Sequence, residues 1–195
     1  MTEQTREKIE FNGTDYRLGR GQYPLELLLR DDREVHIHSD IWLGLIEIPD
    51  EEKIPRPDFT AINKGIVTSC WRGYTGEWVI HNDILCLKDI KGHKESESLL
   101  HHVFPEHVGL VEARWFTGPL DLCSNYFEVG ETEGLTLEID KGLLIAHEKF
   151  ILVTQVKESL IIEHKKFVSE PREGWMRRFI LRLKTLAQKG SHKNT

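Results

Sequence analysis

Short apolar segments that alternate with polar residues, separated by closely spaced turn sequences, constrain the fold of this chain most strongly. Lys8–Phe11 and Thr14–Leu18 flank Asn12-Gly13, a pair suited to the two positive-φ positions of a type I′ hairpin. Later segments repeat the pattern around His81-Asn82-Asp83 and Asp140-Lys141-Gly142. This spacing predicts a mainly antiparallel β fold, built as a sandwich or a partly open barrel.

The remaining elements complete an α+β prediction. Residues 95–104 have helical spacing and stop at Pro105, which predicts a short mid-chain helix. Residues 23–29 fit a short helix or a buried strand equally well. Residues 49–57 are acidic and contain three prolines, which predicts a loop with Pro55 outside any strand ladder. Further strands are predicted at 35–38, 41–48, 66–71, 77–80, 84–87, 110–116, 120–122, 135–139, 143–147, 150–156 and 160–168.

Charge divides the chain into an acidic body and a basic C-terminal segment. The net charge is −6, but from Arg172 onward seven Lys/Arg face one acid, so this segment carries +6 and the body −12. An acidic body repels nucleic acid over most of its surface. The polar N-terminus lacks a signal-peptide pattern, and no apolar run approaches the ~18 residues that span a bilayer. We therefore predict a soluble cytoplasmic protein without nucleic-acid or membrane partners.

Residues 172–189 are predicted to form an amphipathic helix, bounded by Glu170-Pro171 and Gly190. The helix has an apolar stripe and a basic side. The stripe consists of Trp175, Phe179, Ile180, Leu183 and Leu186, and the basic residues are Arg177, Arg178, Arg182, Lys184 and Lys189. Either the stripe packs on the domain's own sheet, or Trp175, Arg178, Phe179 and Arg182 dock on a partner or a second copy. The chain thus divides into a β-rich domain at 1–171, this helix and a tail at 190–195.

Trp71, Arg72 and Tyr74, within the sequence Trp-Arg-Gly-Tyr, form the first candidate binding site. Two aromatic rings beside an arginine can stack on a planar ligand while the guanidinium binds a carboxylate or phosphate. Alternatively the segment is a structural corner, in which the aromatic rings fill the core and Arg72 holds a loop or an acidic neighbour. Buried positions are also predicted for Trp78 and Trp115.

The same corner begins a longer block of spaced residues. Cys70-Trp71-Arg72-Gly73-Tyr74 is followed by Trp78-x-Ile80, Leu85-x-Leu87 and Asp89-Ile90. This block resembles the WRGY-x3-W-x-I-x4-L-x-L-x-x-I pattern of a family of uncharacterised bacterial proteins. Trp115 and the segment from Leu135 to Gly142 extend the resemblance to roughly a third of the chain, whereas the region around Asn125-Tyr126-Phe127 has fewer glycines than the family pattern. The resemblance implies a bacterial cytosolic protein and carries no known activity.

Histidines form a second candidate site. His36 and His38 lie two apart on a predicted strand, so they share a face at a workable spacing for metal ligation. Further ligands would be Asp40, His101, His102 and His107. The same alternation also fits a solvated strand face, and no HExxH-type motif supports a metal. The three cysteines form no CxxC pair and are predicted to be buried thiols; they are Cys70, Cys86 and Cys123. We predict neither metal nor cofactor.

The sequence favours a non-enzymatic bacterial protein-binding module over an enzyme. It contains no GxSxG, P-loop or GxGxxG motif. An acidic body suits an inhibitor-like or immunity-like protein that meets a basic partner. The alternative is a small hydrolase or small-ligand-binding protein that uses the Trp71–Tyr74 corner. A protein partner or self-association is therefore the predicted interaction.

Overall fold

Three two-residue turns set the hairpins of the structure, which is a computed structural model. The φ angles are 51° and 72° at Asn12-Gly13, 50° and 61° at Asn82-Asp83, and 51° and 80° at Lys141-Gly142. A type I′ turn needs positive φ at both central residues, and its twist matches that of the flanking strands. The turns predicted from the sequence therefore join successive antiparallel strands.

The structure describes residues 5–19, 21–30, 48–63, 65, 69–70, 72–92, 97–124, 130–157 and 160–167. The strands within these ranges are β1 (Lys8–Phe11), β2 (Thr14–Leu18), β3 (Leu29–Arg30), β4 (Ile54–Pro55), β5 (Thr75–His81), β6 (Ile84–Lys91), β7 (Val111–Glu112), β8 (Gly118–Cys123), β9 (Gly130–Asp140), β10 (Leu143–Lys157) and β11 (Leu160–Phe167). The helical elements are short: η1 (Pro24–Leu27), η2 (Asp50–Glu52), α1 (Phe59–Asn63) and α2 (Leu100–Val103). The chain is therefore mostly β, as the sequence predicts.

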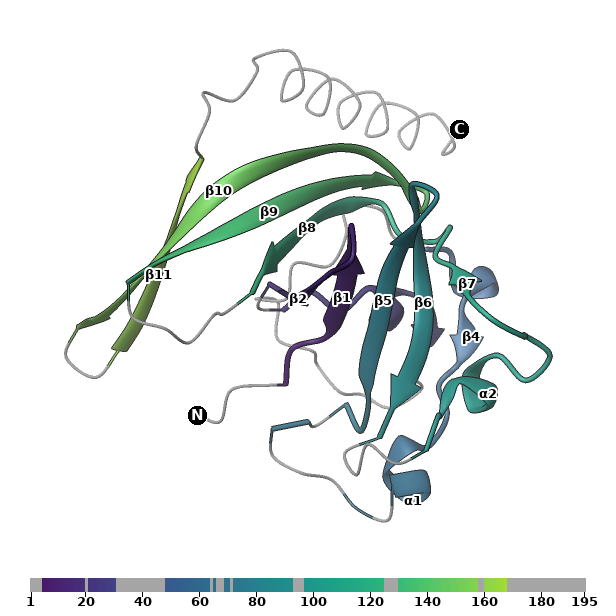
Figure 1. The fold of residues 1–195 in the computed structure, drawn as a ribbon. Coiled ribbons are helices and arrows are strands. Elements are labelled where there is room, and N and C mark those ends of the chain that lie inside the picture. The colour runs from purple at the N-terminus through teal and green to yellow at the C-terminus, as the bar shows by residue number, and fades with distance from the viewer. Residues whose placement is uncertain are drawn as a thin grey trace, which may run out of the picture.

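One large curved sheet has the strand order β11-β10-β9-β8-β2-β1-β5-β6-β7 (Figure 1). Neighbouring strands are antiparallel, except that β1 is parallel to β5. β10 also pairs with β6 where Leu143 faces Ile84, and the Leu85 amide donates to the Gly142 carbonyl at 2.7 Å. The sheet therefore curls until its two sides meet at this end, as in a partly open barrel. We call this the closed end.

The main hydrophobic core lies inside this curvature. Along β8 and β9, Leu120, Leu122, Leu137 and Ile139 are fully buried, whereas the residues between them face the other way. Other buried members of the same cluster are Ile9, Phe11, Leu18, Trp78, Leu85 and Leu87. The predicted burial of Trp78 is confirmed, and Trp115 is half-buried with its Nε1 donating to the Pro24 carbonyl at 3.0 Å.

Four local expectations differ from the structure. Within residues 97–104, the helix α2 is shorter than predicted, because Ser98 bridges to Lys91 and the Leu99 amide donates to the Ile90 carbonyl. Pro55 does occupy a strand, paired with Arg30 in β3. The amides on either side of Pro55 make the ladder bonds, so its missing N–H is not required.

The strands predicted at 143–147 and 150–156 are one continuous strand, β10, with an irregularity between Leu144 and Ala146. Pro119, which lies between the strands predicted at 110–116 and 120–122, belongs to β8 and pairs with Glu138. The segment at 23–29 becomes the helix η1 followed by β3. Glu148 and Lys149, which separate the two predicted strands, pair regularly with Thr136 and Leu135 of β9, so β10 runs through these polar residues without a turn.

Several predicted features lie outside the described residues. These are Trp71, the strands at 35–38 and 41–47, the candidate ligands His36, His38 and Asp40, and the C-terminal helix at 172–189. Among the helices that the structure describes, none is long and apolar enough to cross a membrane.

Candidate functional site

The corner at residues 72–74 is held by side chains that bind three successive backbone carbonyls. Arg56 Nη2 donates to the carbonyl of Arg72 at 3.1 Å, and Asn63 Nδ2 to that of Gly73 at 2.5 Å. The Cys70 thiol lies 3.1 Å from the carbonyl oxygen of Tyr74. Gly73 has φ of 78°, and an added Cβ would lie 2.7 Å from the Phe59 Cβ. The glycine of the Trp-Arg-Gly-Tyr sequence is thus required by both conformation and space.

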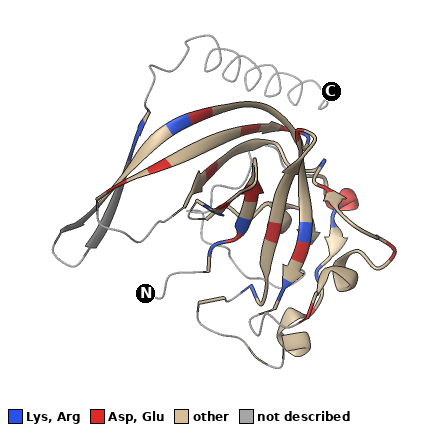
Figure 2. Ribbon diagram, in the orientation of Figure 1, with Lys and Arg blue, Asp and Glu red and all other residues tan. Residues whose placement is uncertain are grey.

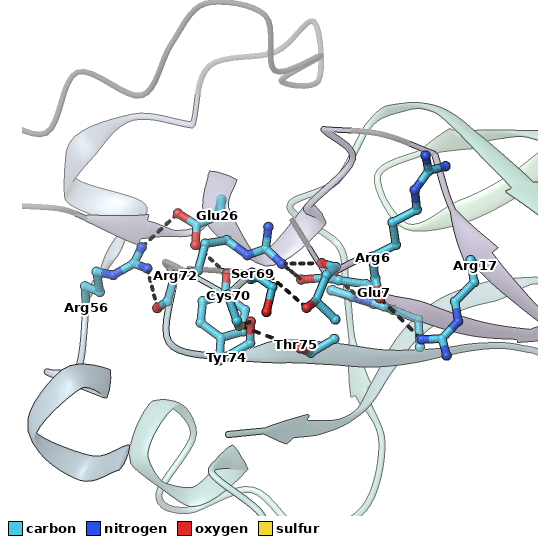
Figure 3. A network of polar contacts seen from close by, with 12 residues as sticks. Arg6, Glu7, Arg17, Glu26, Arg56, Ser69, Cys70, Arg72, Tyr74 and Thr75 are labelled. Atoms are coloured by element: carbon cyan, nitrogen blue, oxygen red, sulfur yellow. Dashed lines mark hydrogen bonds and ion pairs between the residues drawn. The ribbon is translucent and has the colours of Figure 1, made fainter. Parts of the chain in front are cut away.

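Arg72 is enclosed at the centre of a polar network (Figure 3). Its Cζ lies 3.3 Å from the centroid of the Tyr23 ring. Its Nη2 donates to the Thr5 carbonyl at 3.1 Å and lies 3.9 Å from Glu7 Oε1. A guanidinium over an aromatic face is stabilised most when both groups are desolvated. These contacts tie the corner to the N-terminal segment and to the chain just before η1.

Glu7 is the acidic partner of Arg72 and is also fully buried. Its Oε2 accepts a hydrogen bond of 2.6 Å from Trp78 Nε1. Burial raises the pKa of Glu7, because desolvation disfavours the charged carboxylate, and the Arg72 charge and the Trp78 bond oppose that rise. The same burial would lower the pKa of Arg72, but its acidic neighbours, Glu7 first, outweigh it and raise the pKa.

Glu26 and Arg56 form a second buried ion pair beside the first. Arg56 Nη1 donates to Glu26 Oε2 at 2.8 Å, and the Tyr74 hydroxyl donates to Glu26 Oε1 at 2.7 Å. Burial raises the pKa of Tyr74 well above its ordinary value, and the negative charges of Glu26 and Glu7 add to the effect. Tyr74 is therefore a neutral hydrogen-bond donor at physiological pH.

The two ion pairs join segments that are distant in the sequence. Of the predicted site residues, Arg72 and Tyr74 lie together, with 2% and 0% of their surfaces exposed. Their polar groups point toward internal partners, so the arrangement stabilises the meeting of β5 with the N-terminal segment. Sequence reasoning missed Glu7, Glu26 and Arg56. A signal existed for Glu26, which is the one charged residue in the apolar run 23–29.

The predicted histidine cluster is described only in part. His101 and His102 are adjacent, with ring centroids 4.0 Å apart, and both are exposed. His107 Nε2 lies 2.7 Å from the Leu110 carbonyl oxygen. Within the described part of the chain, no group of three His, Cys, Asp or Glu side chains is placed to hold a metal ion.

A second candidate region is the side of β8, β9 and β10 that faces away from the main core, which we call the outer face. Register and alternation place on it Asp121, Cys123, Thr136, Glu138, Asp140, Leu143, Ala146, Glu148, Phe150 and Leu152. Four of these ten residues are acidic, and Figure 2 shows acidic segments along the arch of β9 and β10. Burial, and to a lesser extent the nearby Asp140 charge, raises the pKa of Glu138.

The outer face carries its own apolar cluster at one end and exposed apolar residues at the other. Cys123, Phe150 and Leu152 form a buried cluster separate from the main core. Near the closed end, Leu143 and Ile145 are about half exposed, at 49% and 50%. Ile145 is the extra residue of the β10 irregularity, so it is unpaired in the ladder with β9.

A lysine bridges the polar and apolar parts of this face. Lys165 Nζ lies 4.4 Å from the centroid of the Phe150 ring and 4.9 Å from that of Phe167. The same ammonium donates to Asp121 Oδ1 at 2.5 Å and to Thr136 Oγ1 at 2.6 Å. The fold therefore already places one cation among the acids of the outer face.

The remaining candidate residues, Trp175, Arg178, Phe179 and Arg182, lie outside the described part of the chain. In comparisons with protein families, with curated proteins and with solved structures, nothing matched this chain.

Proposed function

We propose that this chain is a non-enzymatic bacterial protein-binding module, of inhibitor-like or immunity-like character, that recognises a basic protein partner. The proposed contact surface is the closed end of the outer face. It comprises Leu143 and Ile145 together with Glu138 and Asp140. The exposure of these two apolar side chains beside the two acids is the observation that carries the proposal.

The chemistry of this surface suits a partner that offers both apolar and basic groups. Leu143 and Ile145 are half exposed, and their side chains give up no hydrogen bonds when a partner covers them. Covering them removes apolar surface from water. Burial and the nearby Asp140 charge raise the pKa of Glu138, and an incoming lysine or arginine would favour its charged form. Charge complementarity of this kind contributes mainly to association rate and specificity.

The alternative, a small hydrolase or small-ligand-binding protein, would use the Trp71–Tyr74 corner. One observation favours it: Arg72 Nε and Nη1 are buried without a hydrogen-bond acceptor among the described residues. A ligand carboxylate could bind there. However, Arg72 and Tyr74 are enclosed by the fold's own contacts, so a ligand would have to displace part of the network. The outer face needs no such rearrangement and is the preferred candidate.

The test compares capture of partners by wild-type protein and by the double variant Leu143→Lys with Ile145→Lys. Tagged proteins are incubated with an extract of the native bacterium, and bound proteins are identified by mass spectrometry. We expect a basic protein that the wild type retains, that the double variant loses, and that dissociates as salt screens the acids. The purified candidate is then titrated against both proteins.

Val108→Lys is the matched control, because Val108 is 96% exposed and lies between α2 and β7 rather than on the outer face. Val108→Lys should change the free energy of unfolding by no more than ~0.5 kcal/mol, and the double variant, at two half-exposed positions, by ~1 kcal/mol. The proposed surface would be contradicted if Val108→Lys lost the captured protein to the same extent as the double variant, or if the double variant retained it as well as the wild type does.

A further inference from the structure

The apolar cluster of the outer face is buried although it lies on the side of the sheet opposite the main core. Phe150 is 1% and Cys123 is 0% exposed. Phe150 faces Gly134, which in turn faces Cys123, so the three positions share one side. On the other side of the same strands lie the core residues Leu122 and Leu137. A sheet that is apolar on both sides needs a covering layer on each.

The described elements supply only part of the outer layer. Among the described elements, β10 is in extensive contact with β9 and β11, both strands of its own sheet. Phe150 packs over Gly134, where an added Cβ would lie within 3 Å of both the Phe150 ring and the Cys123 sulfur. Lys165 lies over the Phe150 ring. The Lys165 ammonium and Gly134 do not by themselves form a complete layer over Phe150 and Leu152. A further apolar segment therefore fits this face.

The chain itself has a segment with the required chemistry, and it starts beside the cluster. We propose that residues 172–189 cover the outer face, with their apolar stripe on Phe150 and Leu152 and their basic side chains toward its acids. β11 ends at Phe167, which pairs directly with Phe150. Four residues separate Phe167 from Arg172 and span at most ~14 Å. The stripe therefore begins within reach of the cluster.

Charge complementarity supports the same occupant. The segment from Arg172 carries +6, whereas the remainder of the chain carries −12. The outer face presents Asp121 and Glu148 beside the apolar cluster, whereas Glu138 and Asp140 lie nearer the closed end. A stripe flanked by arginines and lysines matches a cluster flanked by carboxylates, and tethering to β11 raises the effective concentration of the segment. This docking is distinct from partner binding at the closed end, and its test does not depend on any partner.

Cys123 provides a local reporter, because it is a reduced thiol inside the cluster. The full-length chain is labelled with a thiol reagent under native conditions, and each cysteine is followed by peptide mass spectrometry. The stripe variant is Phe179→Asp with Leu183→Asp. We expect Cys123 to react at least ~10-fold faster in this variant through local opening. Cys70 and Cys86, which lie elsewhere, should react at the wild-type rate.

The matched control is Thr185→Asn, a polar substitution of similar size on the side of the predicted helix away from the stripe, which leaves the charge of the basic side unchanged. It should leave Cys123 labelling within about twofold of wild type. Unchanged labelling in the stripe variant, or equal acceleration in the control, would overturn the proposal. Slow labelling that becomes fast on dilution of the wild type would also overturn it, in favour of a second copy as the occupant.

A charge swap separates docking from general loss of the fold. If all three thiols accelerate in the stripe variant, Glu148→Lys is compared with Glu148→Lys combined with Arg178→Glu and Arg182→Glu. Docking predicts that Cys123 alone reacts faster in the single variant and that the combination restores slow labelling. Failure of the combination to restore protection overturns the proposal. Neither result changes the expected partner binding through Leu143 and Ile145 at the closed end. Failure of the docking proposal is therefore distinguishable from failure of the proposed function.

Discussion

The Arg72 corner and the outer face of β8–β10 differ in where they place charged and apolar side chains. At the corner, charged Arg72 and Glu7 lie inside the fold. On the outer face, apolar Phe150 lies on the side of the sheet away from the main core. The corner draws its partners from β5, the N-terminal segment and the chain before η1. For the outer face, the described elements supply only a partial covering layer.

This difference separates a structural feature from a candidate for recognition. An unusual residue indicates function most directly when the fold has not already used its bonding capacity. Arg72 and Tyr74 are conspicuous in the sequence, yet their contacts connect segments of the chain itself. Leu143 and Ile145 are inconspicuous in the sequence, yet half of each is exposed beside carboxylates. We therefore propose that the corner serves stability and that the outer face serves recognition.

The largest expected effect is that of Arg72→Met. This substitution should lower the free energy of unfolding by ~3–5 kcal/mol, because it leaves the Glu7 carboxylate buried without its counter-charge. Methionine retains much of the side-chain volume, so the loss reports mainly on charge. Urea denaturation followed by tryptophan fluorescence measures the effect.

The control for this prediction is the double variant Arg72→Met with Glu7→Gln. It should recover a large part of the lost stability, because it removes both charges together. A loss of less than ~1 kcal/mol in the free energy of unfolding of Arg72→Met would contradict the stabilising role of the corner, because typical surface substitutions cost no more than this. The corner would then be a better candidate for ligand binding than for stability.

A smaller effect is expected on the outer face from Gly134→Ala. The added methyl would lie 2.4 Å from Phe150 Cζ and 2.7 Å from the Leu122 carbonyl oxygen. Overpacking of this kind costs ~1–3 kcal/mol, measured again by urea denaturation. Combining Gly134→Ala with Phe150→Leu should recover part of the loss, because the shorter side chain vacates the space. An unchanged free energy of unfolding for Gly134→Ala would mean that Phe150 does not pack against this position.

Local pattern predicted the hairpins well, because their turns depend on residues next to one another. Asn12-Gly13 and Lys141-Gly142 adopt positive φ as expected. Features that depend on contacts between residues distant in the sequence were harder to predict. No sequence pattern indicates that β1 lies parallel to β5, since that pairing depends on the curvature of the whole sheet. The two predicted strands merge into β10 because Glu148 and Lys149 pair with β9, and that cross-strand pairing cannot be read from the local sequence.

The candidate site was predicted only at its sequence-adjacent members. Arg72 and Tyr74 share one short motif, whereas Glu7 and Glu26 come from separate segments, 65 and 48 positions away from Arg72 and Tyr74 respectively. Ion pairs across such separations leave no trace in one sequence. The outer face was missed for a related reason: its acids come from three strands, and only the register brings them together.

The smallest expected effect is a pH dependence at the corner that Glu7→Gln removes. The pKa of Glu7 is raised in the folded protein, so the folded state binds the proton more tightly than the unfolded chain does. Its contribution to stability is therefore fully present below the ordinary glutamate pKa and is lost as pH rises through the folded-state value. The charged groups that face it, Arg72 and Glu26, remain in the variant. Denaturation at a series of pH values from about 4 to 8 should show wild type losing stability relative to Glu7→Gln as pH rises. A constant difference would show that the Arg72 charge and the Trp78 hydrogen bond balance desolvation of Glu7, and a difference that grows in favour of wild type with pH would show that they outweigh it and that the corner is a net favourable ion pair.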